Sequence, residues 1–148
     1  MRLRPYVPAD RAACLALFSS NAPDYFAELE RADFIQTLDE IDDYFVIEAA
    51  DEGIVACGGY AALDETPSVA ALCWGMVRRD LHRRGYGEHL LCERLQRIAA
   101  QPAFQTILIE TTQFSRDFFA RHGFVATRLA ADGFAPGYDL VEMRRPAR

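Results

Sequence analysis

The chain has 148 residues, of which 51% are hydrophobic and 26% are charged, a composition typical of one folded domain with a sizeable core. Its 22 acidic and 16 basic residues give a net charge of −6, which argues against a nucleic-acid partner, because such binding needs a basic face. The N-terminal segment lacks a hydrophobic signal core and no apolar run is long enough to span a membrane, so we expect a cytoplasmic protein without a membrane partner.

The first half of the chain predicts one strand, two helical segments and a meander of strands. Residues 1–7 alternate like an edge strand, "RAACLALFSS" predicts a helix, and an interrupted helical stretch follows, with Pro23 in its loop. "YFVIEA" and "IVACGGYAAL" flank Asp51 and Gly53, which predicts a β-hairpin. "VAALCWGMV" predicts a third consecutive strand, in which Gly75 favours a bulge.

The second half begins with an arginine-rich loop, "RRDLHRR", and a segment in which leucines and an isoleucine recur at helical spacing. "TILIET" is short and nearly all apolar, as expected for a strand near the middle of a sheet. A brief helix over "SRDFFARHG" ends at Gly123. Two short strands around "FVATRLA" and "DLVEMRR", joined by a loop "ADGFAPGY", complete a mixed α/β single domain over residues 1–148.

The cysteines and histidines do not indicate a metal site. The cysteines lie scattered in apolar runs and form no C-x-x-C pair, which favours buried free thiols over disulfides or metal ligands. The three histidines have no ligand spacing with them, so we expect no metal. The four cysteines are Cys14, Cys57, Cys73 and Cys92.

The stretch that bears most on function is "LHRRGYGEHLL", Leu81–Leu91, between a strand and a helix. Gly85 and Gly87 allow a tight turn there, and the backbone N–H groups that open the helix have no partner within it. Because the helix dipole is positive at this end and Arg83 and Arg84 add charge, the junction suits a small anion, above all a phosphate. Taken alone, these residues also fit a plain turn beside solvated arginines.

Two common phosphate-binding loops fit less well. The absence of G-x-x-x-x-G-K-[ST] excludes a P-loop. A dinucleotide-binding fingerprint would need a third glycine at Leu90 and would normally follow the first strand rather than the fourth. Glu110, which ends the next strand as a ribose-binding acid would, keeps the dinucleotide alternative open.

The surroundings of the junction resemble the GNAT acyltransferase superfamily. His82-Arg83-Arg84-Gly85-Tyr86-Gly87 corresponds to the family's [QR]-x-x-G-x-[GA] except at the histidine, and "FFARHGF", Phe118 to Phe124, matches F-Y-x-x-x-G-F except at the tyrosine. The order of the predicted strands also agrees, so the resemblance covers essentially the whole chain. It implies an α/β fold with a mixed, mainly antiparallel central sheet, flanked by helices and splayed between strands 4 and 5, where acetyl-CoA lies.

The resemblance also implies which residues contact the cofactor. The backbone at Met76 and Val77 would pair with the pantetheine arm like an extra strand. Thr112, which stands where the family usually has an asparagine, and Phe118 and Phe119 would complete the site. The pyrophosphate would lie on the amides of Arg83, Arg84, Gly85, Tyr86, Gly87 and Glu88.

The departures from the family pattern concern the catalytic groups. Phe119 stands where many members have a tyrosine that protonates the departing thiolate, so the acid is another group, a water, or missing. The fourth strand contains no carboxylate, which leaves Glu110, at the end of the fifth strand, as the best-placed base and Glu48 as the next. For either carboxylate the alternative is a solvated or ion-paired group at a strand end.

The resemblance implies an N-acetyltransferase in which an amine of a small molecule or peptide attacks the thioester of acetyl-CoA directly. Four acids near the second helix would attract a cationic amine, although a solvated helix face explains them nearly as well. They are Asp24, Glu28, Glu30 and Asp33. The alternative function is a non-catalytic CoA-binding sensor or regulatory module on the same fold. Exposed sheet edges in such folds often pair, which keeps a homodimer open.

Overall fold

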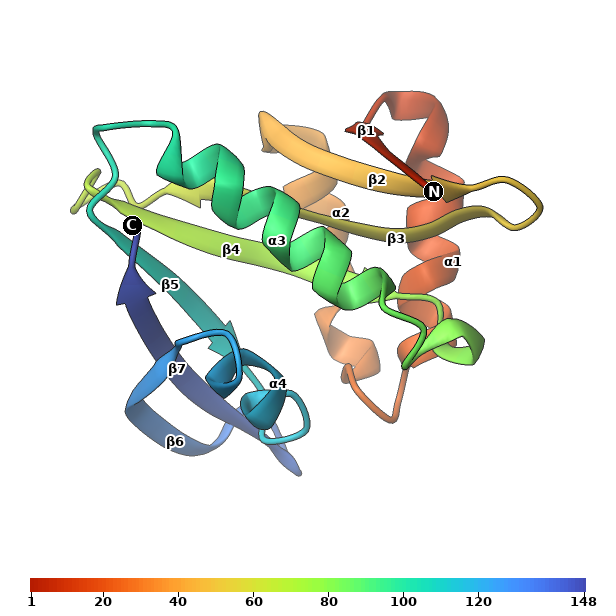
Figure 1. Ribbon diagram of the computed structural model, residues 1–148. Helices are drawn as coiled ribbons and strands as arrows, with labels where there is room; N and C mark the ends of the chain where they lie inside the picture. The colour runs from red at the N-terminus through yellow and green to blue at the C-terminus, as the bar shows by residue number, and fades with distance from the viewer.

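A seven-stranded sheet forms the centre of the computed structural model, which describes residues 1–148 (Figure 1). The strands lie in the order β1-β2-β3-β4-β5-β7-β6, and every neighbouring pair is antiparallel except β4 with β5. The predicted order of strands and helices along the chain is confirmed. The strands are β1 (Arg2–Pro5), β2 (Asp43–Ala49), β3 (Gly53–Ala62), β4 (Val69–Val77), β5 (Thr106–Thr111), β6 (Val125–Ala135) and β7 (Tyr138–Pro146).

Helices cover both faces of the sheet. α3 crosses one face over β3 and β4, whereas α1 and α2 lie on the opposite face, and α4 lies beside β6 and β7 (Figure 1). No helix has both the length and the apolar character needed to cross a membrane. The helices are α1 (Arg11–Asn21), α2 (Arg31–Glu40), α3 (Tyr86–Ala99) and α4 (Arg116–Ala120), with 3-10 turns at Pro8–Asp10, Glu28–Glu30 and Arg79–Leu81.

The sheet divides the hydrophobic core into two sides, because successive residues of a strand point to opposite faces. Beneath α3, Leu91 and Ile98 pack with Ile107 of β5. On the other face, Phe18 of α1 packs in a group that includes Val46 of β2. Burying one such side chain contributes about 1.5–3 kcal/mol, so each helix is fixed to the sheet by several contacts of this size.

β4 and β5 separate after a short parallel contact. Their pairing extends only from Val69–Leu72 against Thr106–Ile109, and β4 then continues to Val77 without a partner on that side. On its other edge, β5 pairs with β7 through Thr111. The predicted splay between the fourth and fifth strands follows directly from this register.

A bulge bends β4 where the strands part. Cys57 pairs with Met76 and Gly59 with Cys73, so β4 has one more residue than β3 between these pairs. The predicted bulge is therefore present, but the residue with left-handed backbone is Trp74, with φ of +46°, rather than its glycine neighbour. Gly75 instead leaves space for a side chain of α3, as described below.

The C-terminal hairpin is longer than the sequence predicts. β6 and β7 include most of the expected loop over residues 131–138, so the prediction of two short strands joined by a loop is wrong. The register moves from Ala130 opposite Leu140 to Ala135 opposite Tyr138, which leaves an irregular segment within β6. In that segment the Asp132 carboxylate accepts a hydrogen bond from the Gly137 N–H, at 2.7 Å.

The cysteines are free thiols, as predicted, but only two of the four are fully buried. Cys14 and Cys57 lie in the core, whereas Cys73 and Cys92 are partly exposed. The expectation of burial is therefore wrong for the last two.

Candidate functional site

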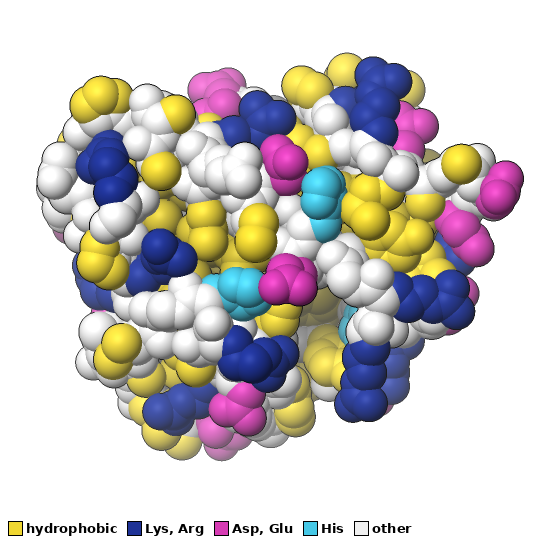
Figure 2. Space-filling model, in the orientation of Figure 1, with side chains coloured by type: hydrophobic (Ala, Val, Ile, Leu, Met, Phe, Trp, Pro, Cys, Tyr) yellow, Lys and Arg dark blue, Asp and Glu magenta, His cyan; other side chains and the backbone are white.

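A cleft of about 890 Å³ occupies the opening between β4 and β5. Its walls are the second half of β4, the end of β5, α4, and the loop that leads into α3. Figure 2 shows basic side chains beside the region where Figure 1 places the start of α3, next to a hollow in which hydrophobic side chains are visible. The cleft therefore combines an apolar interior with positive charge at one end.

Most residues that the sequence assigns to the cofactor line this cleft, although they come from separate elements. Arg84 and Tyr86 do not line it, because Arg84 is exposed and the Tyr86 ring packs near Leu81 and Leu90. The predicted base, Glu110, does line it. The predicted cofactor residues in the cleft are Met76, Val77, Arg83, Gly85, Gly87, Glu88, Thr112, Phe118 and Phe119.

The start of α3 presents unpaired amides to the cleft. Gly85 precedes the helix with φ of +86°, a conformation that glycine adopts without strain. The first hydrogen bond of the helix runs from the His89 N–H to the Gly85 carbonyl, at 3.0 Å. The N–H groups of Tyr86, Gly87 and Glu88 have no acceptor in the protein, and no side chain caps the helix. Such amides bind anions, phosphate in particular.

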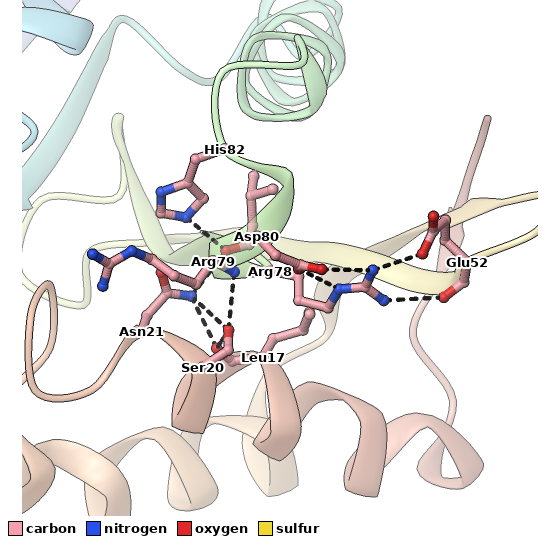
Figure 3. A network of polar contacts seen from close by, with 9 residues as sticks. Leu17, Ser20, Asn21, Glu52, Arg78, Arg79, Asp80 and His82 are labelled. Atoms are coloured by element: carbon pink, nitrogen blue, oxygen red, sulfur yellow. Dashed lines mark hydrogen bonds and ion pairs between the residues drawn. The ribbon is translucent and has the colours of Figure 1, made fainter.

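Hydrogen bonds fix the arginine-rich loop, Arg78–Arg84, against α1 and the end of β4 (Figure 3). His82 Nε2 and Asn21 Nδ2 both contact the Val77 carbonyl, at 2.9 and 2.8 Å. The Arg79 N–H donates to Ser20 Oγ at 3.1 Å. His82, which departs from the family motif, thus holds the loop in place from within the protein.

The four arginines of this loop divide into two pairs. Arg78 is bound by two neighbouring carboxylates, each at 2.6 Å, and Arg79 is bound by Asp24. The side chains of Arg83 and Arg84 form no ion pair or hydrogen bond, and both are exposed beside the start of α3. Only the second pair is therefore free to meet an anionic ligand.

Glu30 is the one buried carboxylate in the cleft. It is 8% exposed, and its Oε2 accepts a hydrogen bond from the Ala27 N–H at 2.9 Å. Desolvation, with a smaller contribution from Asp33, raises the pKa of Glu30 above its ordinary value. Glu110 also lines the cleft, but its side chain is 47% exposed and lies 3.7 Å from Arg128 Nη2. The two carboxylates therefore have different environments.

The other acids singled out in the sequence lie outside the cleft. Glu48 pairs with Arg4 on the outer strands, and Glu28 pairs with Arg31 at 2.6 Å. Of the four acids near α2, only Glu30 lines the cleft. The charge pattern of the sequence does not distinguish Glu30 from the other three. No group of three or more His, Cys, Asp or Glu side chains is placed to hold a metal ion.

Aromatic side chains form much of the remaining wall. Tyr25 packs edge-on against His82 and Phe114, with ring centroids 5.1 and 6.3 Å apart. Phe119 is 9% exposed. Its ring contacts those of Phe118, in α4, and Phe124, after the helix. It brings no polar atom to the cleft, so the position of the usual tyrosine supplies no proton here.

A sequence model of the family described as "Acetyltransferase (GNAT) domain" matches residues 17–146. A search among curated proteins finds no match.

Solved structures of the same fold cover nearly the whole chain. A protein assigned to the GNAT acetyltransferase family from Desulfovibrio desulfuricans is 19% identical over 99% of both chains, with a TM-score of 0.82. The ribosomal-protein-S18-alanine N-acetyltransferase of Escherichia coli is 14% identical over 99% of this chain and 93% of that one, with a TM-score of 0.79. An aminoglycoside 6′-N-acetyltransferase complexed with coenzyme A is 10% identical over 100% of this chain and 98% of that one, with a TM-score of 0.78.

Proposed function

Because the chain belongs to the GNAT family and is an acetyl-CoA-dependent acyltransferase, we propose that its acceptor is a cationic amine of a small molecule or peptide that enters the cleft beside Glu30 and Glu110. The observation that carries the proposal is that unpaired amides and carboxylates line the same cleft. The unpaired amides of α3 open into it at one end, and carboxylates line it as well. The cleft suits a phosphate-bearing donor and a positively charged acceptor together.

For the donor, we propose that the amides of Tyr86, Gly87 and Glu88 hold the pyrophosphate, with Arg83 and Arg84 adding charge. The free edge of β4 beyond its contact with β5 would bind the pantetheine arm as an added strand. Because the Val77 carbonyl already accepts two hydrogen bonds from side chains, the arm would pair with other backbone groups of that edge.

For the transfer, the cationic amine must first lose one proton to the base, which frees the lone pair that attacks the thioester carbon, and the nitrogen loses a second proton to water as the amide forms. The new C–N bond forms, the C–S bond breaks, and the electron pair leaves on the sulfur of CoA. We propose that one of two carboxylates is the base: Glu110, because of its position at the end of β5, or Glu30, which we favour because burial raises its pKa. Both carboxylates line the cleft, and the experiment that separates them is given in the Discussion.

The acceptors of the two named relatives, an aminoglycoside and a ribosomal-protein alanine, are both amines but differ widely in size. In this chain the acceptor side combines a buried carboxylate, Glu30, with the rings of Tyr25, Phe26 and Trp74. A carboxylate attracts the charged amine of a ligand, and aromatic rings beside it contact both the cation and an apolar group on the same ligand. We therefore propose an amine that carries an apolar or aromatic group.

The first test is ligand binding followed by turnover. Acetyl-CoA should raise the melting temperature, because a ligand at one hundred times its Kd stabilises the folded state by about 2.7 kcal/mol. NADH and ATP should do so far less, and equal stabilisation by NADH would favour a dinucleotide site instead. Release of free CoA should then be measured with amines, amino acids and peptides. CoA binding without acetylation of any amine would identify a non-catalytic CoA-binding module.

Cys73 should not carry the acetyl group, although it lies in the cleft. Burial raises the pKa of Cys73 to about 11, so only about one thiol in 10⁴ is ionised at pH 7, and the thiolate is the nucleophilic form. We expect Cys73→Ala to turn over like the wild type and intact-mass spectrometry to show no acetylated protein after mixing with acetyl-CoA alone. A stable mass increase that Cys73→Ala abolishes would show a covalent intermediate instead.

A further inference from the structure

Arg94, on the sheet-facing side of α3, is a buried cation without an anionic partner. Its residue is 3% exposed, and no carboxylate lies within ion-pair distance of it. Its hydrogen bonds go to carbonyl groups: Nη1 donates to Gly59 at 3.2 Å, and Nε donates to Leu90 at 3.4 Å. A guanidinium in this position keeps its positive charge uncompensated within the protein.

The titratable groups that surround Arg94 are neutral ones. They are Cys73 on β4, Tyr44 on β2 and Cys57 on β3. Burial raises the pKa of each of these groups, so none is an anion at neutral pH. Desolvation also lowers the pKa of Arg94, as expected for a charge buried without a counter-ion. The acids that line the same cleft are Glu30, Glu88, Glu110 and Asp117, and none forms an ion pair with Arg94.

Two glycines make room for this guanidinium at the β4 bulge, and a third supplies an acceptor for it. A Cβ atom on Gly75 would lie 2.9 Å from Nη2 of Arg94, and one on Gly58 would lie 3.2 Å from its Cζ. The third glycine, Gly59, supplies the carbonyl that Nη1 contacts. The space is therefore shaped by the β3 and β4 backbones, at the point where β4 leaves β5.

The free end of the guanidinium is accessible from the cleft. Every fully buried side-chain nitrogen or oxygen of the protein has a hydrogen-bond partner. Nη2 of Arg94 makes no hydrogen bond, so it is not fully enclosed, and Arg94 lines the cleft together with Gly75 and Cys73. Its N–H groups are thus available to an acceptor bound between β4 and β5.

We propose that Arg94 binds the sulfur of CoA as negative charge develops on the sulfur. It thus stabilises the leaving group in place of the acid that is missing at Phe119. The proposal rests on the acetyl transfer described above. As the amine nitrogen, which has already lost one proton to the base, bonds to the thioester carbon, the C–S bond breaks and its electron pair remains on sulfur, while the nitrogen loses its second proton to water. The guanidinium donates a hydrogen bond to the thiolate and gives up no proton itself. Donors fixed in advance at a site of developing charge are an effective form of catalysis.

A purely structural role explains Arg94 less well. Burying an unpaired charge destabilises a protein, and an apolar side chain of similar volume is often neutral or stabilising in its place. Arg94→Met should therefore fold with an unchanged or higher melting temperature while losing activity. If Arg94 served only to support the fold, the same substitution would lower the melting temperature and leave the chemistry of bound CoA unchanged.

The test measures the pKa of the CoA thiol in the complex, from the pH dependence of CoA binding in calorimetry and from the ultraviolet absorbance of the thiolate. In the wild type we expect the thiol pKa to fall by about one to three units below the ordinary value of about 8.5, as for an acid beside a fixed cation. In Arg94→Met it should return to the ordinary value. The kcat for acetyl transfer should fall by about 10²–10³-fold, as when one such donor is removed.

Arg97→Met is the matched control, since Arg97 lies on the same helix, stacks on Phe45 at 4.7 Å and does not line the cleft. It should leave the thiol pKa and kcat unchanged. Should Arg94→Met not fold, Arg94→Gln removes the charge but keeps an N–H donor, so the thiol pKa should rise part of the way to its ordinary value. An ordinary thiol pKa in the wild-type complex, or the same lowered pKa in an Arg94 variant that binds CoA, overturns the proposal while acetyl transfer stands. Failure of the wild type to bind CoA would instead contradict the donor site itself.

Discussion

Replacing Gly87 with valine should abolish CoA binding while the protein still folds. A Cβ atom at Gly87 would lie 3.6 Å from Val77 Cγ2 and 3.9 Å from Phe118 Cζ, which are ordinary contacts, so the backbone of the free protein has room for a Cβ atom there. The two γ carbons of valine would extend into the gap between β4 and α4 and keep a phosphate away from the amides of α3. Losing two hydrogen bonds to a charged group, each worth about 1.5–3 kcal/mol, weakens binding more than about 100-fold.

Calorimetry with CoA measures this effect, and Gly87→Ala provides the graded control. Alanine adds only the Cβ atom and should stabilise α3 by up to about 1 kcal/mol, because glycine is unfavourable within a helix. We therefore expect Gly87→Ala to melt higher than the wild type and to bind CoA with intermediate affinity. A folded Gly87→Val protein with wild-type CoA affinity would show that phosphate does not lie on these amides.

The parts of the structure that the sequence predicts are those fixed by neighbouring residues. The period-2 and helical patterns identify the strands and helices in their correct order, and Gly85 marks the turn before α3 where its φ of +86° requires glycine. The hairpin at the C-terminus is different. Its Asp132 and Gly137 are typical turn residues, but they build an irregular segment within paired strands, because the register across β6 and β7 decides their positions.

Side chains buried by distant segments are the parts that the sequence does not predict. Arg94 lies four residues from both Leu90 and Ile98, so it interrupts an apolar helical face, which is a visible signal of an unusual position. Its burial, however, depends on glycines of β3 and β4. Glu30 is likewise one of several acids near α2, and only the docking of its loop against the cleft distinguishes it.

A carboxylate that removes the proton of the amine should be essential for transfer, and we expect Glu30→Gln to have a larger effect than Glu110→Gln. Burial raises the pKa of Glu30 and so makes it a stronger base than an ordinary glutamate, whereas Glu110 is exposed and its carboxylate lies 3.7 Å from Arg128. Loss of the base should lower kcat/KM by about 10²–10⁴-fold without changing CoA affinity. Glu40→Gln, at an exposed acid on α2 outside the cleft, should have no effect.

The pH dependence of kcat/KM identifies the base independently of how far each substitution lowers kcat/KM. A carboxylate base is inactive when protonated, so the rate falls as the pH drops through its pKa in the folded protein. Because desolvation raises the pKa of Glu30, this acidic limb should lie above the ordinary range of a glutamate, and it should disappear in Glu30→Gln. If the limb persists in Glu30→Gln and disappears in Glu110→Gln, the base is Glu110, at the end of β5. A limb that survives both substitutions would exclude both carboxylates and leave a water molecule to accept the proton.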